Sequence, residues 1–402
     1  MVAHALTRRA KLLLALFAGG ALLRLLFLSP SRPLPRPLVS LTSTPQRLNT
    51  SLPPTLWSLT RQSLPPRRIR IHLPITGDDP TETAPPLAAL DPIFRHTLIE
   101  LRYVEDEGPA TKYLPVVREA FERAAAAEED DFSPLDEPVV VCDDDHVYSP
   151  VLVETLVKAW ARKEAKAAVG LRGWRVRRDL HWGVGWDDVR RHVIEGWRLS
   201  ESYQVGVLTA NEGYLIAPSF FLPPSIRASL SSNATRRTFD RAALSSLVPL
   251  LNPPSSAPPS LHLVDDILLS GSLSSAHIPR YVVPLPPPEP PSLDITPPAR
   301  TAEERDGGPR SPLEHHLREH GKSRNEANDE ALRWFEKAWA AERAEGVGEM
   351  WFDVRGEAER RRGGFPGEPR WAGLVRRLWS QVSKRAYYGR VRKRWGEVIW
   401  WN

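Results

Sequence analysis

Three consecutive aspartates, Asp143, Asp144 and Asp145, carry the clearest chemical signal in the sequence. They directly follow an apolar run at 138–142 (PVVVC), and a helical pattern begins soon afterwards, at Pro150. Carboxylates this close together repel one another unless a cation lies among them. Because Mg²⁺ and Mn²⁺ favour carboxylate and phosphate oxygens, the run predicts a divalent cation held against a phosphorylated ligand. The alternative is a solvated acidic turn that caps the following helix.

Two histidines are candidates for a third metal ligand. His146 follows the aspartates directly, and His277 lies much further along the chain. A lone histidine is more often a surface or packing residue, so either side chain has a purely structural interpretation.

A second acidic pair, Asp265 and Asp266, follows the apolar run at 261–264 (LHLV) at the start of an expected helix. A carboxylate within reach of a substrate hydroxyl can accept its proton, so this pair is a candidate general base. Two acids at a helix N-terminus also serve as a cap with a favourable dipole contact. Both interpretations stay open at this point.

The elements that must position these acids alternate along the chain. Apolar or alternating runs predict strands, and amphipathic stretches between them predict helices. This order predicts an α/β fold with a mostly parallel, Rossmann-like sheet flanked by helices, whose ligands bind beyond the carboxyl ends of the strands. The expected strands are 38–43, 68–73, 98–104 and 138–142, and the expected helices are about 56–62, 112–127 and 150–165; 205–218 and 262–270 are further strand or strand-to-helix candidates, and 174–202 is a Trp-rich irregular region.

Composition excludes several classes of protein. The 402 residues are 41% hydrophobic and 26% charged, which excludes wholesale disorder, collagen and a multi-span membrane protein. The net charge of +5 comes from scattered residues, so nucleic acid is not an expected partner. The single cysteine, Cys142, excludes an intramolecular disulfide and a cysteine-based zinc site. Forty prolines predict extended connectors around a folded body.

The N-terminal region predicts a membrane anchor. Residues 12–28 are apolar apart from Arg24, and basic residues precede them, so we expect a cytosolic N-terminus at 1–11 and a signal-anchor helix at 12–28. A Pro-rich stem at 29–37 would then hold a lumenal body. A cleaved signal peptide is the alternative. Sequons at Asn49 and Asn233 are compatible with a secretory-pathway location, which we expect to be the Golgi.

Five segments, in chain order, resemble a family of GT-A-fold, family 2-like glycosyltransferases that includes type II membrane and capsule-type enzymes. The resemblance covers about 38–284, leaving a Pro-rich linker at 285–300 and a helical, basic, Trp-rich extension at 301–402. It implies an enzyme that transfers a sugar from a UDP- or GDP-linked donor to a glycan, lipid or protein acceptor, with Mn²⁺ or Mg²⁺. The segments are VSLTSTPQRL (39–48), GPATKYLP (108–115), CDDDHVYSP (142–150), NEGYLIAPSFF (211–221) and VDDILLSGSLSSAHIPRYVVP (264–284).

The resemblance implies roles for individual residues on the donor side. Asp145 would be the direct metal ligand, with Asp143 and Asp144 contacting the ribose or the waters of the metal, and Asp143 as a second candidate ligand. Lys112 would neutralise the diphosphate, unless it is a solvated lysine. Two further residues lie beyond the first strand, where the base and ribose would bind: Thr44 and Arg47.

On the acceptor side, the resemblance favours Asp266 over Asp265 as the catalytic base of an inverting reaction. Gly213 would let the backbone approach the sugar or acceptor, unless it belongs to an ordinary turn. Three tryptophans are candidates for stacking on an acceptor: Trp174, Trp182 and Trp186. Two other functions remain open: a haloacid-dehalogenase-type phosphatase with Asp143 as nucleophile, and an inactive binding protein on a transferase fold.

Overall fold

A computed structural model describes residues 33–75, 90–127, 131–182, 192–231, 242–247, 253–295, 321–344, 351–352, 382, 387 and 389. The chain divides into two units, Met1–Pro35 and Arg36–Asn402, and every element below belongs to the second unit. Among the described residues, no helix combines the length and apolarity needed to cross a membrane. The predicted anchor at 12–28 and the sequon at Asn233 lie outside those residues.

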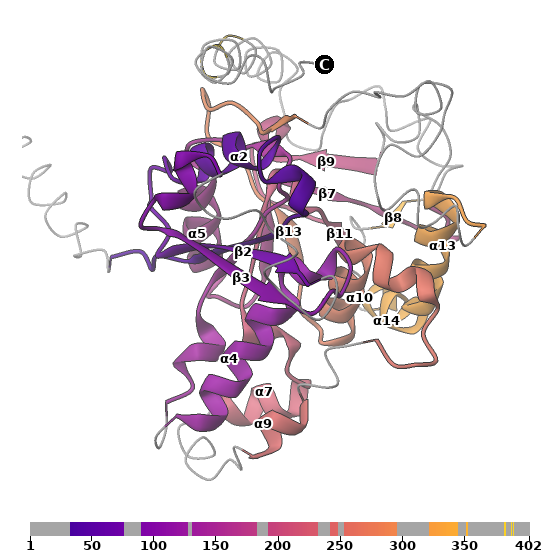
Figure 1. Ribbon diagram of the computed structural model, residues 1–402. Coiled ribbons are helices and arrows are strands. Elements are labelled where there is room, and N and C mark those ends of the chain that lie inside the picture. The colour runs from indigo at the N-terminus through magenta and orange to yellow at the C-terminus, as the bar shows by residue number, and fades with distance from the viewer. Residues whose placement is uncertain are drawn as a thin grey trace, which may run out of the picture. The chain divides into compact units, whose positions relative to one another are not determined.

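The main sheet has eight strands in the spatial order β10, β13, β6, β12, β4, β1, β2, β3; Figure 1 labels β2, β3 and β13 among them. Strand β1 pairs in parallel with β2 and β4, β2 with β3, and β6 with β13, whereas β12 and β10 run antiparallel to their neighbours. This arrangement confirms the predicted mostly parallel α/β sheet. The strands are β1 (Leu38–Thr42), β2 (Arg68–Pro74), β3 (Ile99–Val104), β4 (Val139–Val141), β6 (Ala168–Gly170), β10 (Tyr203–Gln204), β12 (Tyr214–Ile216) and β13 (Arg280–Val282).

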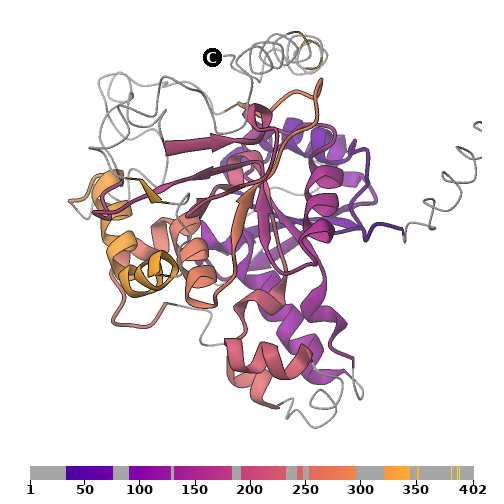
Figure 2. The same cartoon turned by 180° about the vertical axis from the view of Figure 1, so that it is seen from behind.

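Helices cover both faces of this sheet (Figures 1 and 2). Helices α2 (Leu52–Leu59) and α5 (Leu152–Arg162) are joined by the Gln62 amide, which donates to the Ser149 carbonyl and accepts from the Val153 N–H. Helices α4 (Leu114–Ala126) and α10 (Asp265–Ser275) belong to the other face. The β-strand side chains between them, such as Leu41 and Val140, are fully buried, which stabilises the fold by about 2 kcal/mol for each large aliphatic side chain.

A small antiparallel sheet lies beside the main one, in the order β11 (Val207–Leu208), β7 (Arg172–Trp174), β9 (Val193–Glu195). It occupies part of the region that the sequence predicted as irregular. Two further pairs join distant parts of the chain: β5 (His146–Val147) with β14 (Leu293–Asp294), and β8 (Val176–Arg177) with β15 (Trp351–Phe352).

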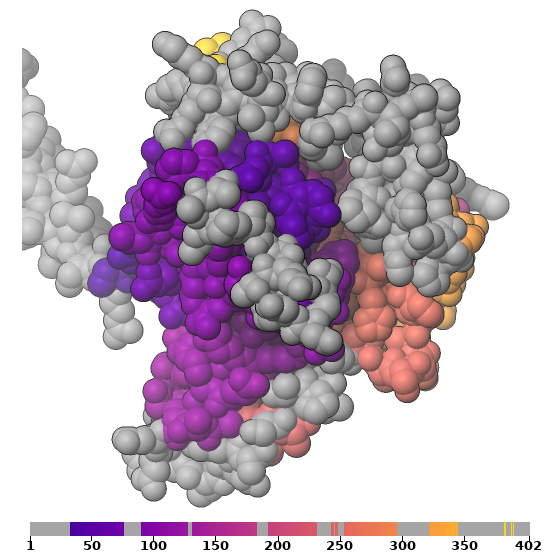
Figure 3. All heavy atoms as spheres, viewed as in Figure 1, coloured from indigo at the N-terminus to yellow at the C-terminus, as the bar shows by residue number. Residues whose placement is uncertain are grey.

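The remaining helices pack around this body. Helices α7 (Pro224–Ser231) and α9 (Ala242–Leu247) share an apolar cluster with α4. Helices α13 (Arg324–Trp334) and α14 (Glu336–Ala344) contact α10, and Figure 3 shows the orange surface of this segment beside the salmon surface of α10. The contact is close, since a Cβ added to Gly271 of α10 would lie 2.1 Å from the Phe335 ring.

Candidate functional site

Acidic and basic side chains gather beyond the carboxyl ends of β1 and β4. Asp143, Asp144 and Asp145 follow β4 after one residue, Cys142, and Ser43 directly follows β1, which is the neighbouring parallel strand. Ligands of parallel sheets bind at this edge, so the acids lie where the strand order predicted a site.

Lys112, in the short 3₁₀ helix η4 (Ala110–Lys112), joins the two acidic groups of the sequence. Its Nζ lies 2.5 Å from Asp143 Oδ1 and 2.9 Å from Asp265 Oδ2. Its carbonyl oxygen accepts a 2.6 Å hydrogen bond from Ser40 Oγ of β1. Burial disfavours the ammonium, but the surrounding carboxylates more than offset this and raise the pKa of Lys112 well above its ordinary value. The lysine is therefore a buried, charged partner of both acidic groups and not a solvated one.

A glycine brings this lysine to its place. Gly108 has a φ of +65°, and a Cβ there would lie 2.7 Å from the carbonyl oxygen of His262. Only glycine fits both the backbone angle and the close approach. The turn before Lys112 is thus pressed against the segment that leads into α10, where Asp265 begins the helix.

Both carboxylate oxygens of Asp144 are bound by protein side chains. Ser43 Oγ donates a 2.5 Å hydrogen bond to Asp144 Oδ2, and Arg47 Nη1 forms an ion pair with Oδ1. The Asp144 carbonyl accepts from Thr55 Oγ1 at 3.0 Å. Burial raises the pKa of Asp144, and the Arg47 charge works in the opposite direction. Asp144 therefore fixes the loop after β1 to the acidic run.

Asp143, Asp145 and His146 form a group, called here the metal-type group, whose possible ligand atoms all lie within 4.8 Å of one another. His146 Nδ1 lies 2.8 Å from Asp145 Oδ1, and Arg47 Nη1 lies 3.2 Å from Asp145 Oδ2. Although burial disfavours the imidazolium, the hydrogen bond and charge of Asp145 raise the pKa of His146 to about 9. Once His146 releases its proton, two carboxylates and one imidazole form a donor set that suits a divalent cation such as Mn²⁺.

The other predicted third ligand, His277, is not part of this group. It lies exposed just beyond the C-terminal end of α10, whereas Asp265 lies at the opposite end. The structure therefore brings together His146, and not His277, with the aspartates.

Tyr148 connects Asp143 with the backbone segment that contacts Asp266. Its hydroxyl accepts a 2.7 Å hydrogen bond from the Asp143 N–H and lies 3.0 Å from the Ala210 carbonyl. Ala210, in the 3₁₀ helix η7 (Ala210–Glu212), in turn donates its N–H to Asp266 Oδ1 at 3.3 Å. One residue thus connects the acidic run with Asp266.

The two acids of α10 differ in their surroundings. Asp265 is buried and lies against Lys112, whereas Asp266 is only half-buried. Burial, reinforced by the charge of Asp265, raises the pKa of Asp266 well above its ordinary value. A carboxylate with a raised pKa that remains partly accessible is suited to accept a proton.

The other sequence-predicted residues are placed as follows. Thr44 is half-buried beside the 3₁₀ helix η1 (Pro45–Arg47), and its side chain makes no capping hydrogen bond. Trp174 and Trp182 contact each other with ring centroids 4.8 Å apart, while Trp186 lies outside the described residues. Asn49 is exposed.

The surroundings of Gly213 fit the second of its two predicted interpretations, a turn, and not a close approach to a sugar. Its φ is +79°, and a Cβ there would lie 2.9 Å from Leu152 Cδ1 of α5. The glycine is therefore explained by its turn and by packing inside the fold.

Four residues of the site carried no prediction of their own: Ser43, Tyr148, Ala210 and Tyr214. Ser43 could have been found, because it ends a strand next to the one that carries the aspartates. Tyr148 lies within the acidic motif itself. Tyr214, on β12, is fully buried, and its hydroxyl has no hydrogen-bond partner among the described residues; only the fold places it near Asp265.

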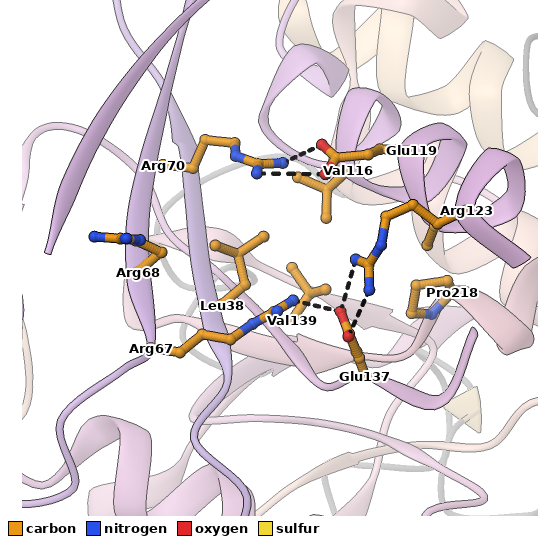
Figure 4. Close-up of a pocket in the computed structure, with 11 residues that line it drawn as sticks. Leu38, Arg67, Arg68, Arg70, Val116, Glu119, Arg123, Glu137, Val139 and Pro218 are labelled. Carbon is orange, nitrogen blue, oxygen red and sulfur yellow. Dashed lines mark hydrogen bonds and ion pairs between the residues drawn. The ribbon is translucent and has the colours of Figure 1, made fainter. Parts of the chain in front are cut away.

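A separate pocket lies at the opposite, amino ends of the same strands (Figure 4). Three of its four arginines are already paired with glutamates: Arg67 with Glu137, Arg123 Nη2 with Glu137 Oε1 at 2.8 Å, and Arg70 Nη1 with Glu119 Oε2 at 2.5 Å. We therefore place the candidate site at the acidic edge. The pocket is lined by Leu38, Arg67, Arg68, Arg70, Val116, Glu119, Ala120, Arg123, Glu137, Val139 and Pro218.

Comparison with solved structures finds distant likenesses, among them the two that follow. No protein-family model and no curated protein sequence matches the chain. The structure of 4-diphosphocytidyl-2C-methyl-D-erythritol synthase is 12% identical and covers 58% of this chain and 98% of its own, with a TM-score of 0.28. The mannosyltransferase PcManGT from Pyrobaculum calidifontis, in complex with GDP-Man and Mn²⁺, is 16% identical and covers 90% of this chain and 88% of its own, also with a TM-score of 0.28. Because both TM-scores are this low, neither structure is used to assign residues of the site.

Proposed function

We propose that the protein is a metal-dependent glycosyltransferase that moves a sugar from a UDP- or GDP-linked donor to a hydroxyl of a glycan, lipid or protein acceptor. The observation that carries the proposal is the spacing of Asp143, Asp145 and His146 within 4.8 Å, beside a second acidic group held by the same lysine. A single acidic turn would account for the first group but not for its connection to the second.

The proposed donor side consists of Asp143, Asp145 and His146, which would hold Mn²⁺ or Mg²⁺. When bound, such an ion stabilises the negative charge of a departing diphosphate. Lys112 adds a fixed positive charge at the same place, and Arg47 and Thr44 border it from the loop after β1. Arg47 also holds Asp144 and Asp145, so it orders the loop around a donor.

The proposed acceptor side is Asp266. The acceptor hydroxyl oxygen forms a new bond to the anomeric carbon, the bond from that carbon to the diphosphate oxygen breaks, and the nucleoside diphosphate leaves with the electron pair. Asp266 takes the hydroxyl proton. Asp265 is buried against Lys112, which supports a positioning role for it beside Asp266. This division of roles is the basis for proposing an inverting course.

The membrane-anchored arrangement is part of the same proposal and rests on the sequence. The apolar run at 12–28 and the basic residues before it support a type II protein whose transferase body faces the Golgi lumen. Glycosidase-sensitive mass at Asn49 would support this location.

The proposal is tested by thermal unfolding of the full chain with GDP or UDP, each with and without Mn²⁺. We expect stabilisation only when nucleotide and metal are both present, by about 2.7 kcal/mol at a ligand concentration of 100 times the Kd. Asp145→Asn should abolish this stabilisation, because the carboxylate proposed to bind the metal is lost. The exposed Asp136→Asn is the matched control and should respond like the unmodified protein. Metal-independent stabilisation, or an unaltered response of Asp145→Asn, would contradict the proposal.

A further inference from the structure

Arg172, at the start of β7, is a half-buried cation whose charge acts on the buried carboxylate of Glu212 only from beyond ion-pair distance. It forms no ion pair with any described residue, and its buried Nε has no hydrogen-bond partner there. The carboxylate opposite it in the register, Glu195 of β9, is paired with Arg198 at 2.8 Å. Glu212 lies nearby, but it accepts the Ser292 N–H at 3.0 Å and is not within ion-pairing distance of the arginine. A half-buried guanidinium without an ion-pair partner is suited to bind an anion.

The position of Arg172 ties it to the acceptor side of the candidate site. Its carbonyl oxygen accepts a 3.2 Å hydrogen bond from the Thr209 N–H, and the next residue along, Ala210, donates to Asp266. The backbone of Arg172 is therefore hydrogen-bonded to the segment whose next residue contacts the proposed base.

Aromatic rings continue the surface beyond this arginine. The Arg172 guanidinium lies 5.9 Å from the centroid of the Trp174 ring, and Trp174 contacts Trp182. Asp329 of α13 fixes Trp182 by accepting its backbone N–H at 2.6 Å. Both rings are half-buried, so each keeps an accessible part. Such rings offer an apolar surface for the C–H faces of a sugar, next to a positive charge.

We propose that Arg172, with Trp174 and Trp182, binds an acidic sugar, and that the acceptor therefore carries a phosphate or carboxylate group near its reactive hydroxyl. That the bound sugar is an acceptor rests on the proposed transferase function. The binding of an acidic sugar can be measured without that function. A phosphate and a carboxylate both satisfy the bidentate geometry of a guanidinium, so the experiment includes both.

The test is a calorimetric titration of the full chain, in the presence of EDTA, with methyl α-glucoside, glucose 6-phosphate, glucuronate and inorganic phosphate. We expect the two acidic sugars to bind at least about tenfold more tightly than the neutral sugar, because a charge-assisted hydrogen bond is gained. Inorganic phosphate should bind more weakly than glucose 6-phosphate, because it lacks the ring that contacts the tryptophans.

Variants distinguish binding at Arg172 from a general effect of the positive charge of the protein. Arg172→Gln should lower the affinity for acidic sugars by about tenfold or more, and Arg172→Lys should have an intermediate effect. Arg198→Gln should also weaken binding, because it frees Glu195 to pair with Arg172. The matched control is Arg61→Gln, which removes an arginine that lies 4.6 Å from the Trp57 ring elsewhere on the protein and should change nothing.

Equal affinity for neutral and acidic sugars, or unaltered binding by Arg172→Gln, would overturn the inference. The same variants are titrated with GDP or UDP and Mn²⁺, which Arg172→Gln should bind as the unmodified protein does. If the unmodified protein fails to bind nucleotide, the proposed function fails, whereas the sugar titration still decides the role of Arg172.

Discussion

At the scale of single residues, the site depends on side chains that serve two partners at once. The ammonium of Lys112 faces Asp143 and Asp265, and the hydroxyl of Tyr148 faces the backbone of Asp143 and Ala210. The acids themselves were predictable, because carboxylates after a buried strand are visible in the sequence. Their partners were not, since Lys112 lies 31 residues before Asp143 and only the folded chain shows that the two meet.

Tyr148→Phe tests the bridge between the acidic run and Ala210. The change keeps the ring but leaves a buried N–H and a buried carbonyl without the hydroxyl, which should lower the free energy of unfolding by about 1 to 3 kcal/mol. It should also weaken metal-dependent nucleotide binding, because Asp143 loses its support. Chemical unfolding and the nucleotide titration measure both effects. Tyr103→Phe, at an exposed tyrosine, is the control, and an equal loss in both variants would contradict the assignment.

At the scale of elements, the buried strands and long helices were predicted well because their patterns are local. Helix α2 was expected at about 56–62 but spans Leu52–Leu59, since Pro53 and Pro54 occupy its first turn, where proline is tolerated. The short strands β7 and β9 were missed, because the pairing of β7 with Val207 and Leu208 arises from residues more than 30 positions away. Such pairing leaves no local pattern in the sequence.

Gly213→Ala tests the turn between η7 and β12. Alanine would have to adopt a φ of +79° and would displace Leu152, so we expect a loss of about 2 to 4 kcal/mol in the free energy of unfolding. Gly321→Ala is the matched control, because Gly321 also has a positive φ, +66°, but has no atom within 4 Å of the added Cβ. It should lose only the backbone part, about 1 kcal/mol. Equal losses in denaturant unfolding would show that Leu152 does not constrain the turn.

His72, in β2, predicts a pH dependence of stability. Burial, helped by the charges of Arg70 and Arg102, lowers the pKa of His72 from 6.5 to about 3. Between these values the unfolded chain binds the proton and the folded protein does not, so stability falls as the pH falls. The slope from this residue is at most about 1.4 kcal/mol per pH unit. Unfolding of the unmodified protein and His72→Gln across this range should diverge accordingly, whereas parallel curves would contradict the prediction.

At the scale of the whole molecule, residues 324–344 are joined to the sheet by buried charges. Arg280 of β13 is fully buried, and its Nη2 lies 2.8 and 2.7 Å from the two carboxylate oxygens of Glu342 in α14. The Arg280 guanidinium also lies 5.3 Å from the centroid of the Trp339 ring. The sequence predicted a helical segment here, but a contact between residues 62 positions apart could not be derived from it.

Glu342→Ala should destabilise the protein by about 3 to 5 kcal/mol, because it leaves the Arg280 charge buried without its partner. The double variant Arg280→Met, Glu342→Leu should recover most of this loss, since it removes both charges. Thermal and denaturant unfolding of the three proteins measure the effect. A loss in the double variant as large as in the single one would show that packing, and not charge pairing, holds this segment.

The two backbone hydrogen bonds of Ala210 restrict which sequence changes this turn can tolerate. Its carbonyl faces the tyrosine that supports the acidic run, and the N–H of the same residue faces Asp266. A side-chain replacement at this residue leaves both backbone groups in place, whereas inserting or deleting one amino acid in the turn would rotate them away together. Changes in length there should be far more harmful than changes in residue type.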